Sequence, residues 1–526
     1  MAITQEIIPQ EIMPAYNENI FAVKSSNVSQ ERFNYVFDLY DYQNSFLSRI
    51  KMPPRPDGYC VFDSHRIMEN YVSYDFDPNA TGYTQNPNSY CVYKIYFGES
   101  YVHYWDVYDD IWWNGQVGFY STSEKHNFSV GDKVLYSRTD PTVTANTNYI
   151  GVHTITNVIS DYQIVIDMAW GESTVPGTNA GTLVLFNKET TTFSGISSTN
   201  NFIYQINAVK EFEEFNQWNF EDYNINTTQN TTKKLLTTIP TSGVEVRRTD
   251  KFWLSFMSNQ TYGSSTGIIK TYDASGTLLG KYKTYNQYGS LVKTQERFVK
   301  IGIGPAQLNS FDSSNTWVMS GSLPILTDNV KSYSFNFGSY NYSQAPDTSQ
   351  TYTFDIDDEC ALWSTVRLVF LDRMGSFVGY NFRGGSKNDT SIERTNYRKG
   401  YGTYSIPTAV DTLYSKYPSP DAQFVGTRSS TRGTWGYNSQ DRGLSTISTD
   451  IDEYVTVYSS WESQEIGDWL AELATSPVVY QQLEDGTFKA VTIEDMQIEV
   501  QKRENGDLIG YEFRFKYSNK NNVQRG

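Results

Sequence analysis

The sequence predicts an all-β to α+β protein built from several antiparallel β-sandwiches or barrels. Aromatic residues are abundant, with 41 Tyr, 29 Phe and 11 Trp among 526 residues. Together with Val, Ile and Thr they fall in short runs that are typical of strands. Asn, Gly and Ser separate these runs, as expected of turns, and one segment has a clear helical period. At about 150 residues per domain, the length predicts roughly three to four domains.

The first predicted domain covers residues 1–120 and continues into 191–240. Its strands are predicted at 33–41 and 90–97, where apolar side chains alternate or run continuously over strand lengths. Residues 59–72 fit either a short helix or a bent strand, and their periodicity does not decide between the two.

Residues 121–190 are predicted to form a small SH3-like β-barrel inserted into this first domain. A turn at Val130-Gly-Asp-Lys-Val134 opens a strand, and β-branched residues alternate over 149–158. Further runs at 162–167 and 181–186 bring the series to about five short strands, which suits a barrel of that size.

The next predicted unit is a β-domain at 241–355. The pattern Y-[DN]-x-x-G-x-L occurs at 272–278 and again at 285–291. Each Gly suits the positive φ of a turn, so the pattern predicts consecutive hairpins. Two copies are too few for a solenoid, which needs at least about three repeats.

The last predicted domain, 356–526, is a sheet packed by one helix. The helix is predicted at 464–475, with Ser463 as its N-cap, because four apolar residues follow an i, i+3, i+4, i+7 pattern. These residues are Ile466, Trp469, Leu470 and Leu473. Runs at 362–371, 378–382 and 452–458 predict strands of the sheet.

Charge and composition exclude several classes of protein. The 42 Lys and Arg against 59 Asp and Glu give a net charge of −17, which argues against a surface built to neutralise phosphates. Three Cys cannot form a disulfide scaffold, and four scattered His leave little for a His-rich metal site. The N-terminus lacks the pattern of a secretory signal, and no apolar run is long enough for a membrane helix. We therefore expect a soluble protein with no cofactor and no membrane anchor.

Short motifs that resemble catalytic or metal sites are interpreted as structural. Gly263-Ser-Ser-Thr-Gly267 has the letters of a nucleophile elbow, but a strand follows it where the elbow needs a helix. The carboxylates of Asp355-Ile-Asp-Asp-Glu359 lack the loop glycine of an EF-hand, so a solvated acidic turn is preferred. Buried thiols are likewise preferred to a zinc site for the Cys–His neighbours Cys60, His65, Cys91 and His103.

Two groups of residues are candidates for binding surfaces. One is a basic cluster that could contact neighbouring subunits or, less favoured, DNA: Arg367, Arg373, Arg383, Lys387, Arg394, Arg398 and Lys399. The other is Trp112 and Trp113, which lie close to Asp106, Asp109 and Asp110 in the sequence. This second group suits either a subunit interface or a platform for stacking sugar rings.

Runs near both ends of the chain resemble a family of virion structural proteins from tailed phages of Bacteroidetes hosts, including crAss-like phages with short tails. The runs are Pro14-Ala-Tyr-Asn17, Phe33-Asn-Tyr-Val-Phe-Asp-Leu-Tyr40, Lys51-Met-Pro-Pro-Arg-Pro-Asp-Gly58, Phe62-Asp-Ser-His65, Val366-Arg-Leu-Val-Phe-Leu-Asp-Arg-Met-Gly-Ser-Phe377, Thr475-Ser-Pro-Val-Val-Tyr480 and Asn521-Asn-Val-Gln-Arg525. The resemblance is weakest over 191–350, and no motif in it is catalytic.

The resemblance implies a non-enzymatic subunit of the virion neck or tail, made in the host cytoplasm. It would form a ring with copies of itself, six- or twelve-fold, contact other neck and tail proteins, and surround a channel through which DNA passes without sequence recognition. An alternative is a glycan- or receptor-binding tail fibre or adhesin. A third reading, a hydrolase of host polysaccharide, would need a pair of carboxylates whose separation the sequence does not reveal.

Overall fold

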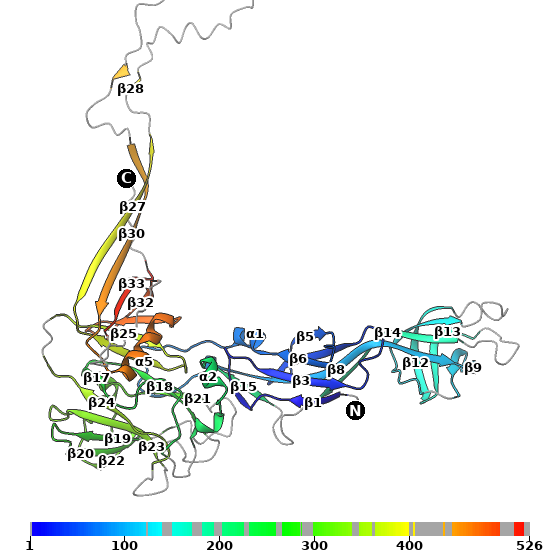
Figure 1. The fold of residues 1–526 in the computed structure, drawn as a ribbon, viewed down its shortest axis with the longest axis horizontal. Helices are drawn as coiled ribbons and strands as arrows, with labels where there is room; N and C mark the ends of the chain where they lie inside the picture. Colours follow the sequence, from blue (N-terminus) through cyan, green and yellow to red (C-terminus); the bar gives the residue numbers. More distant parts are fainter. Residues whose placement is uncertain are drawn as a thin grey trace, which may run out of the picture.

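The computed structural model describes residues 3–122, 125–138, 150–170, 181–193, 202–225, 231–258, 266–284, 286, 298–338, 347–359, 363–398, 403–404, 435–436, 444–494 and 510–519. Figure 1 shows a body, an arm that extends to one side and ends in a small β-module, and a two-stranded ribbon that projects from the body in another direction. The regular structure is mostly antiparallel β-sheet, which confirms the predicted fold class.

The arm is a β-sandwich built around one long strand. That strand is β8 (Tyr90–Val107), and its sheet also holds β2 (Ile12–Pro14), β4 (Asn34–Asp41), β5 (Phe46–Met52), β14 (Gly181–Phe193) and β15 (Ile203–Ile206). The second sheet consists of β1 (Ile3–Ile7), β3 (Ile20–Ser25) and β6 (Tyr59–Asp63). Phe37 of β4 stacks on Phe62 of β6 with ring centroids 4.6 Å apart and contacts Phe97 of β8 edge-on at 5.6 Å. These rings fill the space between the two sheets.

Residues 59–72 contain both of the predicted alternatives, one after the other. Strand β6 covers the first residues, and the short helix α1 (His65–Met68) follows it. Met68 is buried against the sandwich core.

The module at the end of the arm takes its strands from both sides of residue 121. It consists of the far ends of β8 and β14 together with β9 (Asp109–Trp113), β10 (Gln116–Tyr120), β11 (Lys133–Arg138), β12 (Gly151–Ser160) and β13 (Gln163–Ala169). Its apolar core is a cluster of buried side chains that come from between Trp105 and Leu185 in the sequence. Asn114 and Gly115 join β9 to β10 with φ values of 44° and 84°, which are typical of the tight turn of a hairpin.

The body is built from two sheets that share one core. The larger sheet contains β7 (Gly82–Gln85), β16 (Asn224–Ile225), β18 (Trp253–Ser258), β21 (Phe298–Gly302), β25 (Val366–Leu371), β26 (Phe377–Phe382), β27 (Ser386–Arg398), β30 (Leu444–Tyr458), β31 (Val479–Gln482), β32 (Phe488–Ile493) and β33 (Glu512–Tyr517). The smaller sheet contains β17 (Val244–Val246), β19 (Thr266–Tyr272), β20 (Leu278–Thr284), β22 (Thr316–Ser320), β23 (Ser332–Gly338) and β24 (Tyr352–Ile356).

This shared core joins the two regions that were predicted as separate domains on either side of residue 355. The ring centroids of Phe256 in β18 and Phe337 in β23 lie 4.4 Å apart. Both rings belong to one buried apolar cluster whose members extend from Tyr83 to Phe515 in the sequence. Strand β7, from the N-terminal region, pairs with β21 at the edge of the larger sheet. The body therefore combines segments far apart in the sequence.

Local predictions within the body are confirmed. Helix α5 (Gln464–Thr475) begins at Ser463, whose hydroxyl accepts a hydrogen bond from the Ile466 amide at 3.4 Å. Trp469 of this helix packs on Phe370 of β25 at 5.6 Å between ring centroids. The first Y-[DN]-x-x-G-x-L copy is the turn between β19 and β20, where Gly276 has a φ of 78°. Most of the second copy lies outside the described residues.

Candidate assembly surfaces

Arg367, the first residue of the predicted basic cluster, lies in the core. Its Nη1 donates to Asp250 Oδ2 at 2.8 Å, and its Nε donates to Gln482 Oε1 at 3.0 Å. Arg367 and Asp250 are both almost fully buried, and Asn381 also donates to that carboxylate at 2.6 Å. This ion pair therefore joins β25 to the connection between β17 and β18 inside the body, and Arg367 cannot contact DNA or a neighbouring subunit.

Arg373 and Arg383 are also held by carboxylates of the body. Arg373 lies 2.8 Å from Glu472 on α5 and 2.5 Å from Glu211. Arg383 pairs with Asp357 and, at 3.2 Å, with Glu245. These pairs connect segments that are distant in the sequence.

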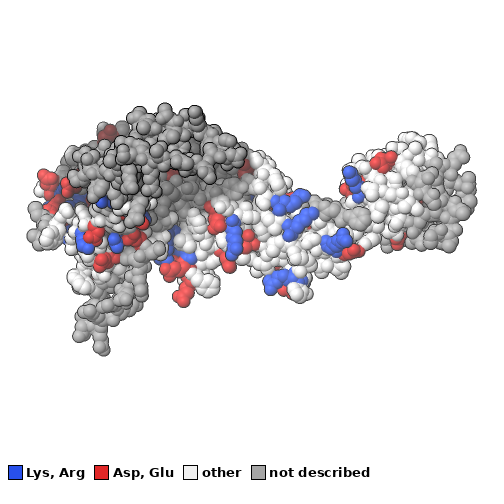
Figure 2. Space-filling view, turned by 90° about the horizontal axis from the view of Figure 1, so that it is seen from above, with Lys and Arg blue, Asp and Glu red and all other residues white. Residues whose placement is uncertain are grey.

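The remaining basic residues belong to the projecting ribbon of β27 and β30. Lys387 and Arg394 are exposed on β27, and Lys387 pairs with Asp389 at 2.8 Å. Arg398 ends β27, and Lys399 lies outside the described residues. The structure thus divides the predicted cluster between the interior of the body and the ribbon. Figure 2 likewise shows Lys and Arg interspersed with Asp and Glu over the body and arm.

The two faces of the ribbon differ in polarity. Antiparallel pairing places Ile392 opposite Ile451 on the face that carries the buried Val455 and Val457 closer to the body. Ile392 is nonetheless 54% exposed, because the described residues beyond the body do not cover this face. On the other face, Asp450 lies directly opposite Glu393. The face with the Ile392–Ile451 pair also carries Glu453, opposite Thr390, and Arg394, opposite Thr449. On the other face, two carboxylates oppose each other.

The strand pairing of the ribbon can be followed within the described part of the chain. Strand β27 pairs only with β30 there, and β30 pairs with β33 only from Tyr454 to Tyr458. Beyond Tyr454, the described strand pairing of β30 is with β27, and Asp452 and Glu453 make further interactions.

The predicted Trp pair lies at the end of the arm, but the two residues do not form one flat platform. They are consecutive in β9, and successive side chains of a strand point to opposite faces. Trp112 is 60% exposed, whereas Trp113 is half-buried. Asp109 and Asp110 are buried, so neither lies beside Trp112 as an open carboxylate. Trp112 alone is available for stacking.

An open groove of about 510 Å³ on the body contains most of the predicted acidic turn. Its carboxylates are paired with cations: Asp358 lies 2.8 Å from Arg248 and 2.7 Å from Lys331. Hydrogen bonds from Arg248 and Lys331 lower the pKa of Asp358 to about 2. Trp363 at the rim is 62% exposed. The predicted solvated turn is thus only partly correct: Asp358 is exposed and ion-paired, but Asp355 belongs to β24 and the Asp357 side chain is buried against Arg383.

The other predicted chemical motifs do not assemble into a site in the described residues. His65 Nδ1 lies 2.6 Å from Asp63, and His103 Nε2 lies 2.7 Å from the His126 carbonyl oxygen. Burial raises the pKa of the Cys60 thiol to about 11. The described residues contain no group of three or more His, Cys, Asp or Glu placed to hold a metal ion. The first residues of the G-x-S-x-G motif, 263–265, lie outside the described residues.

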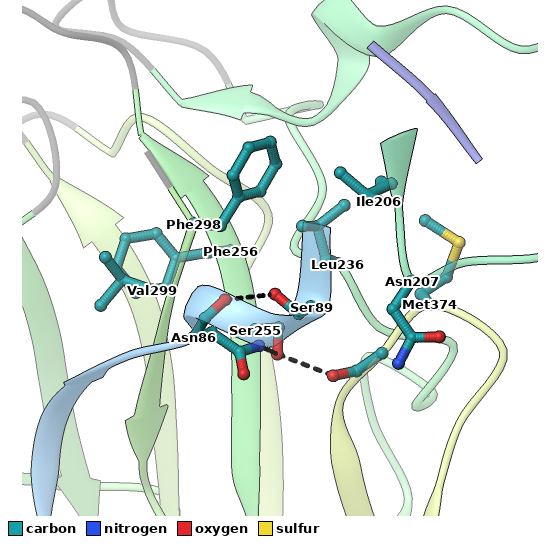
Figure 3. Close-up of a pocket in the computed structure, with 11 residues that line it drawn as sticks. Asn86, Ser89, Ile206, Asn207, Leu236, Ser255, Phe256, Phe298, Val299 and Met374 are labelled. Atoms are coloured by element: carbon teal, nitrogen blue, oxygen red, sulfur yellow. Dashed lines mark hydrogen bonds between the residues drawn. The ribbon is translucent and has the colours of Figure 1, made fainter. Parts of the chain in front are cut away.

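Figure 3 shows a small pocket at the junction of the arm and the body. Its volume is about 10 Å³, which is room for roughly one water molecule. Asn86 donates to Ser255 Oγ at 3.4 Å, and Ser255 donates to the Gly375 carbonyl at 2.9 Å. The cavity is a polar joint between segments and is too small for an organic ligand.

Comparison with known proteins adds little. No family model and no curated protein matches the chain. Among solved structures, a chain described as phage phi92 endosialidase is similar at 11% sequence identity, over 100% of this chain and 70% of that chain, with a TM-score of 0.16. We base no argument on a similarity of that size. Within the described residues, no helix is long and apolar enough to cross a membrane.

Proposed function

We propose that this chain is a non-enzymatic structural subunit of a tailed-phage virion that forms a symmetric ring in the neck or tail. The observation that carries the proposal is the ribbon of β27 and β30, which extends beyond the body and exposes the apolar side chains of Ile392, Leu444 and Ile447. A two-stranded ribbon is marginally stable at best on its own in water. Contact with other subunits would supply the missing cover.

The remaining architecture supports a role in assembly. The arm, the body and the ribbon extend in different directions (Figure 1), so one subunit can contact several neighbours. Sequence runs near both ends of the chain resemble virion proteins. This resemblance is the reason to place the subunit in a virion. With a net charge of −17, a ring of such subunits would repel the DNA backbone and let it pass without sticking.

Quantitative mass spectrometry of purified phage particles tests this proposal. We expect the chain in intact virions at a fixed copy number that is a multiple of the ring size. If purified particles lack the chain although infected cells contain it, the proposal is contradicted.

A glycan-binding tail fibre or adhesin is the second candidate, and the exposure of Trp112 favours it. An indole face open to solvent at the end of an arm suits stacking on a sugar ring. A glycan array probed with the wild type and with Trp112→Ala tests this function. Binding that is lost in the variant supports the adhesin, with Trp317→Ala as the matched control, since Trp317 is 55% exposed on the body.

A further inference from the structure

The open groove on the body is built where two parallel strands end. Strands β17 and β24 pair in parallel, with Val246 opposite Ile356, so the segments that follow them leave the sheet at the same edge. These segments, 247–249 and 357–359, form one part of the lining. Residues 363–365, which lead into β25, and Glu484, in the turn between β31 and β32, complete the described lining.

An ion pair holds one part of this lining in place. Arg248 donates from Nε and Nη2 to the two carboxylate oxygens of Asp358, at 2.8 and 3.0 Å. Its guanidinium also donates to the backbone carbonyls of Thr327, Asp328 and Val330 at 3.1–3.3 Å. Bidentate pairs of this kind have a fixed geometry. These charged groups therefore need little reorganisation when a ligand binds.

Other polar groups of the groove are not used within the described part of the chain. The Thr365 hydroxyl is buried and has no hydrogen-bond partner there. The side chains of Ser364 and Glu484 also make no hydrogen bond or ion pair with any described residue. The indole of Trp363, next to these hydroxyls in the sequence, is 62% exposed. The groove thus combines an open aromatic ring with unused donors and acceptors.

We infer that this groove is a binding site for a neutral oligosaccharide. The C–H face of a sugar ring packs on an indole, and its hydroxyls donate to carboxylates and accept from hydroxyl and guanidinium groups. The volume of about 510 Å³ lies in the range of roughly 300–1,000 Å³ that is usual for small-molecule sites. The site lies on the body, so it is separate from Trp112 on the arm and does not depend on the ring proposed above.

The charge of the lining favours a neutral ligand. Two basic and four acidic side chains give 2 − 4 = −2: Arg247, Arg248, Asp357, Asp358, Glu359 and Glu484. Acidic glycans and nucleic acid would be repelled by this net charge. A cationic peptide is less favoured than a sugar, because the two guanidinium groups would face it and the two hydroxyls can also donate, whereas a cation needs only acceptors.

A glycan array that carries neutral and acidic oligosaccharides tests this site. It is probed with the full-length wild type, with Trp363→Ala and with Trp461→Ala. Trp461 is the matched control, because it is 74% exposed on the body but does not line the groove. We expect the wild type to bind neutral glycans, the signal to fall at least about tenfold in Trp363→Ala through loss of stacking, and Trp461→Ala to bind like the wild type.

Two further variants identify the site independently of the indole. Glu484→Gln, in an exposed turn, should weaken binding of the same neutral glycans, whereas Trp112→Ala on the arm should not. Thermal midpoints equal to that of the wild type show that the variants are folded. Absence of binding to neutral glycans, a preference for acidic ones, or binding that survives in Trp363→Ala overturns the inference. The mass of the assembled chain, measured on the same samples, tests the ring separately.

Discussion

At the scale of single residues, the molecule depends on buried charges whose partners come from distant segments. Arg367 and Asp250 are 117 positions apart in the sequence, yet their side chains meet in the core. Removing one partner of such a pair leaves an uncompensated buried charge, whereas removing an exposed charge costs little. Stability should therefore respond very differently to basic residues of the same sequence cluster.

Arg367→Met should lower the free energy of unfolding by about 3–5 kcal/mol, because Asp250 would remain buried without its cation. Arg394→Met on the exposed ribbon is the matched control and should change it by less than about 0.5 kcal/mol. Urea unfolding of both variants, followed by tryptophan fluorescence, measures the difference. Equal effects of the two substitutions would contradict the buried role of Arg367.

Asp372 should make the protein less stable as the pH rises. Burial, reinforced by the nearby Glu472, raises the pKa of Asp372 from 3.8 to about 7, although Thr237, Thr238 and Ser376 donate hydrogen bonds to it. A native pKa above the unfolded one means that the native state holds more protons between pH 4 and 7. The contribution to stability is thus present below about pH 4 and is lost as the pH rises to 7.

The slope from this one group is at most about 1.4 kcal/mol per pH unit. Comparing the thermal midpoints of wild type and Asp372→Asn from pH 4 to 8 isolates it from the other carboxylates. We expect the difference between the two proteins to change across this range and to level off above pH 7. A constant difference would show that Asp372 has an ordinary pKa.

At the scale of elements, structure set by nearby residues was predictable from the sequence. Helix α5 was predicted with its N-cap, because Ser463 and the four apolar positions act within the helix itself. The strand at 452–458 was predicted from its alternation, but β30 begins at Leu444. The earlier half of that strand has few apolar residues, so periodicity gave no signal there.

The candidate surfaces were less predictable, because burial depends on contacts between distant segments. Nothing in the residues around Arg367 indicates that Asp250 will meet it in the core. Trp112 and Trp113 look equivalent in the sequence, and only the pairing of β9 with β10 determines which face each one occupies. Predicting the ribbon would have required the register of β27 against β30, which no local sequence pattern supplies.

Arg394→Glu should weaken association between subunits, because it adds a carboxylate next to Glu393 and Asp450 on a ribbon that is expected to contact neighbouring copies. The effect should be largest at low ionic strength, since salt screens exposed charges. Sedimentation velocity at low and high salt measures it, with Arg394→Lys as the charge-preserving control. Equal association of the Arg394→Glu and Arg394→Lys variants would contradict this role.

At the scale of the whole molecule, the body, the arm and the ribbon are three parts with different structural roles. The body carries the large shared core, the arm holds a small module away from it, and the ribbon exposes apolar side chains. The ribbon is incomplete on its own, because apolar side chains that are exposed together, such as Ile392, Leu444 and Ile447, are usually covered by a partner. This incompleteness is the physical reason to expect copies of the chain to assemble.

The mass and symmetry of the purified full-length chain test this account most directly. Native mass spectrometry gives the copy number, and averaged electron-microscope images of the same sample give the symmetry. We predict a closed ring of six or twelve identical subunits. A stable monomer, or a trimer of the kind found in fibres, would contradict the account.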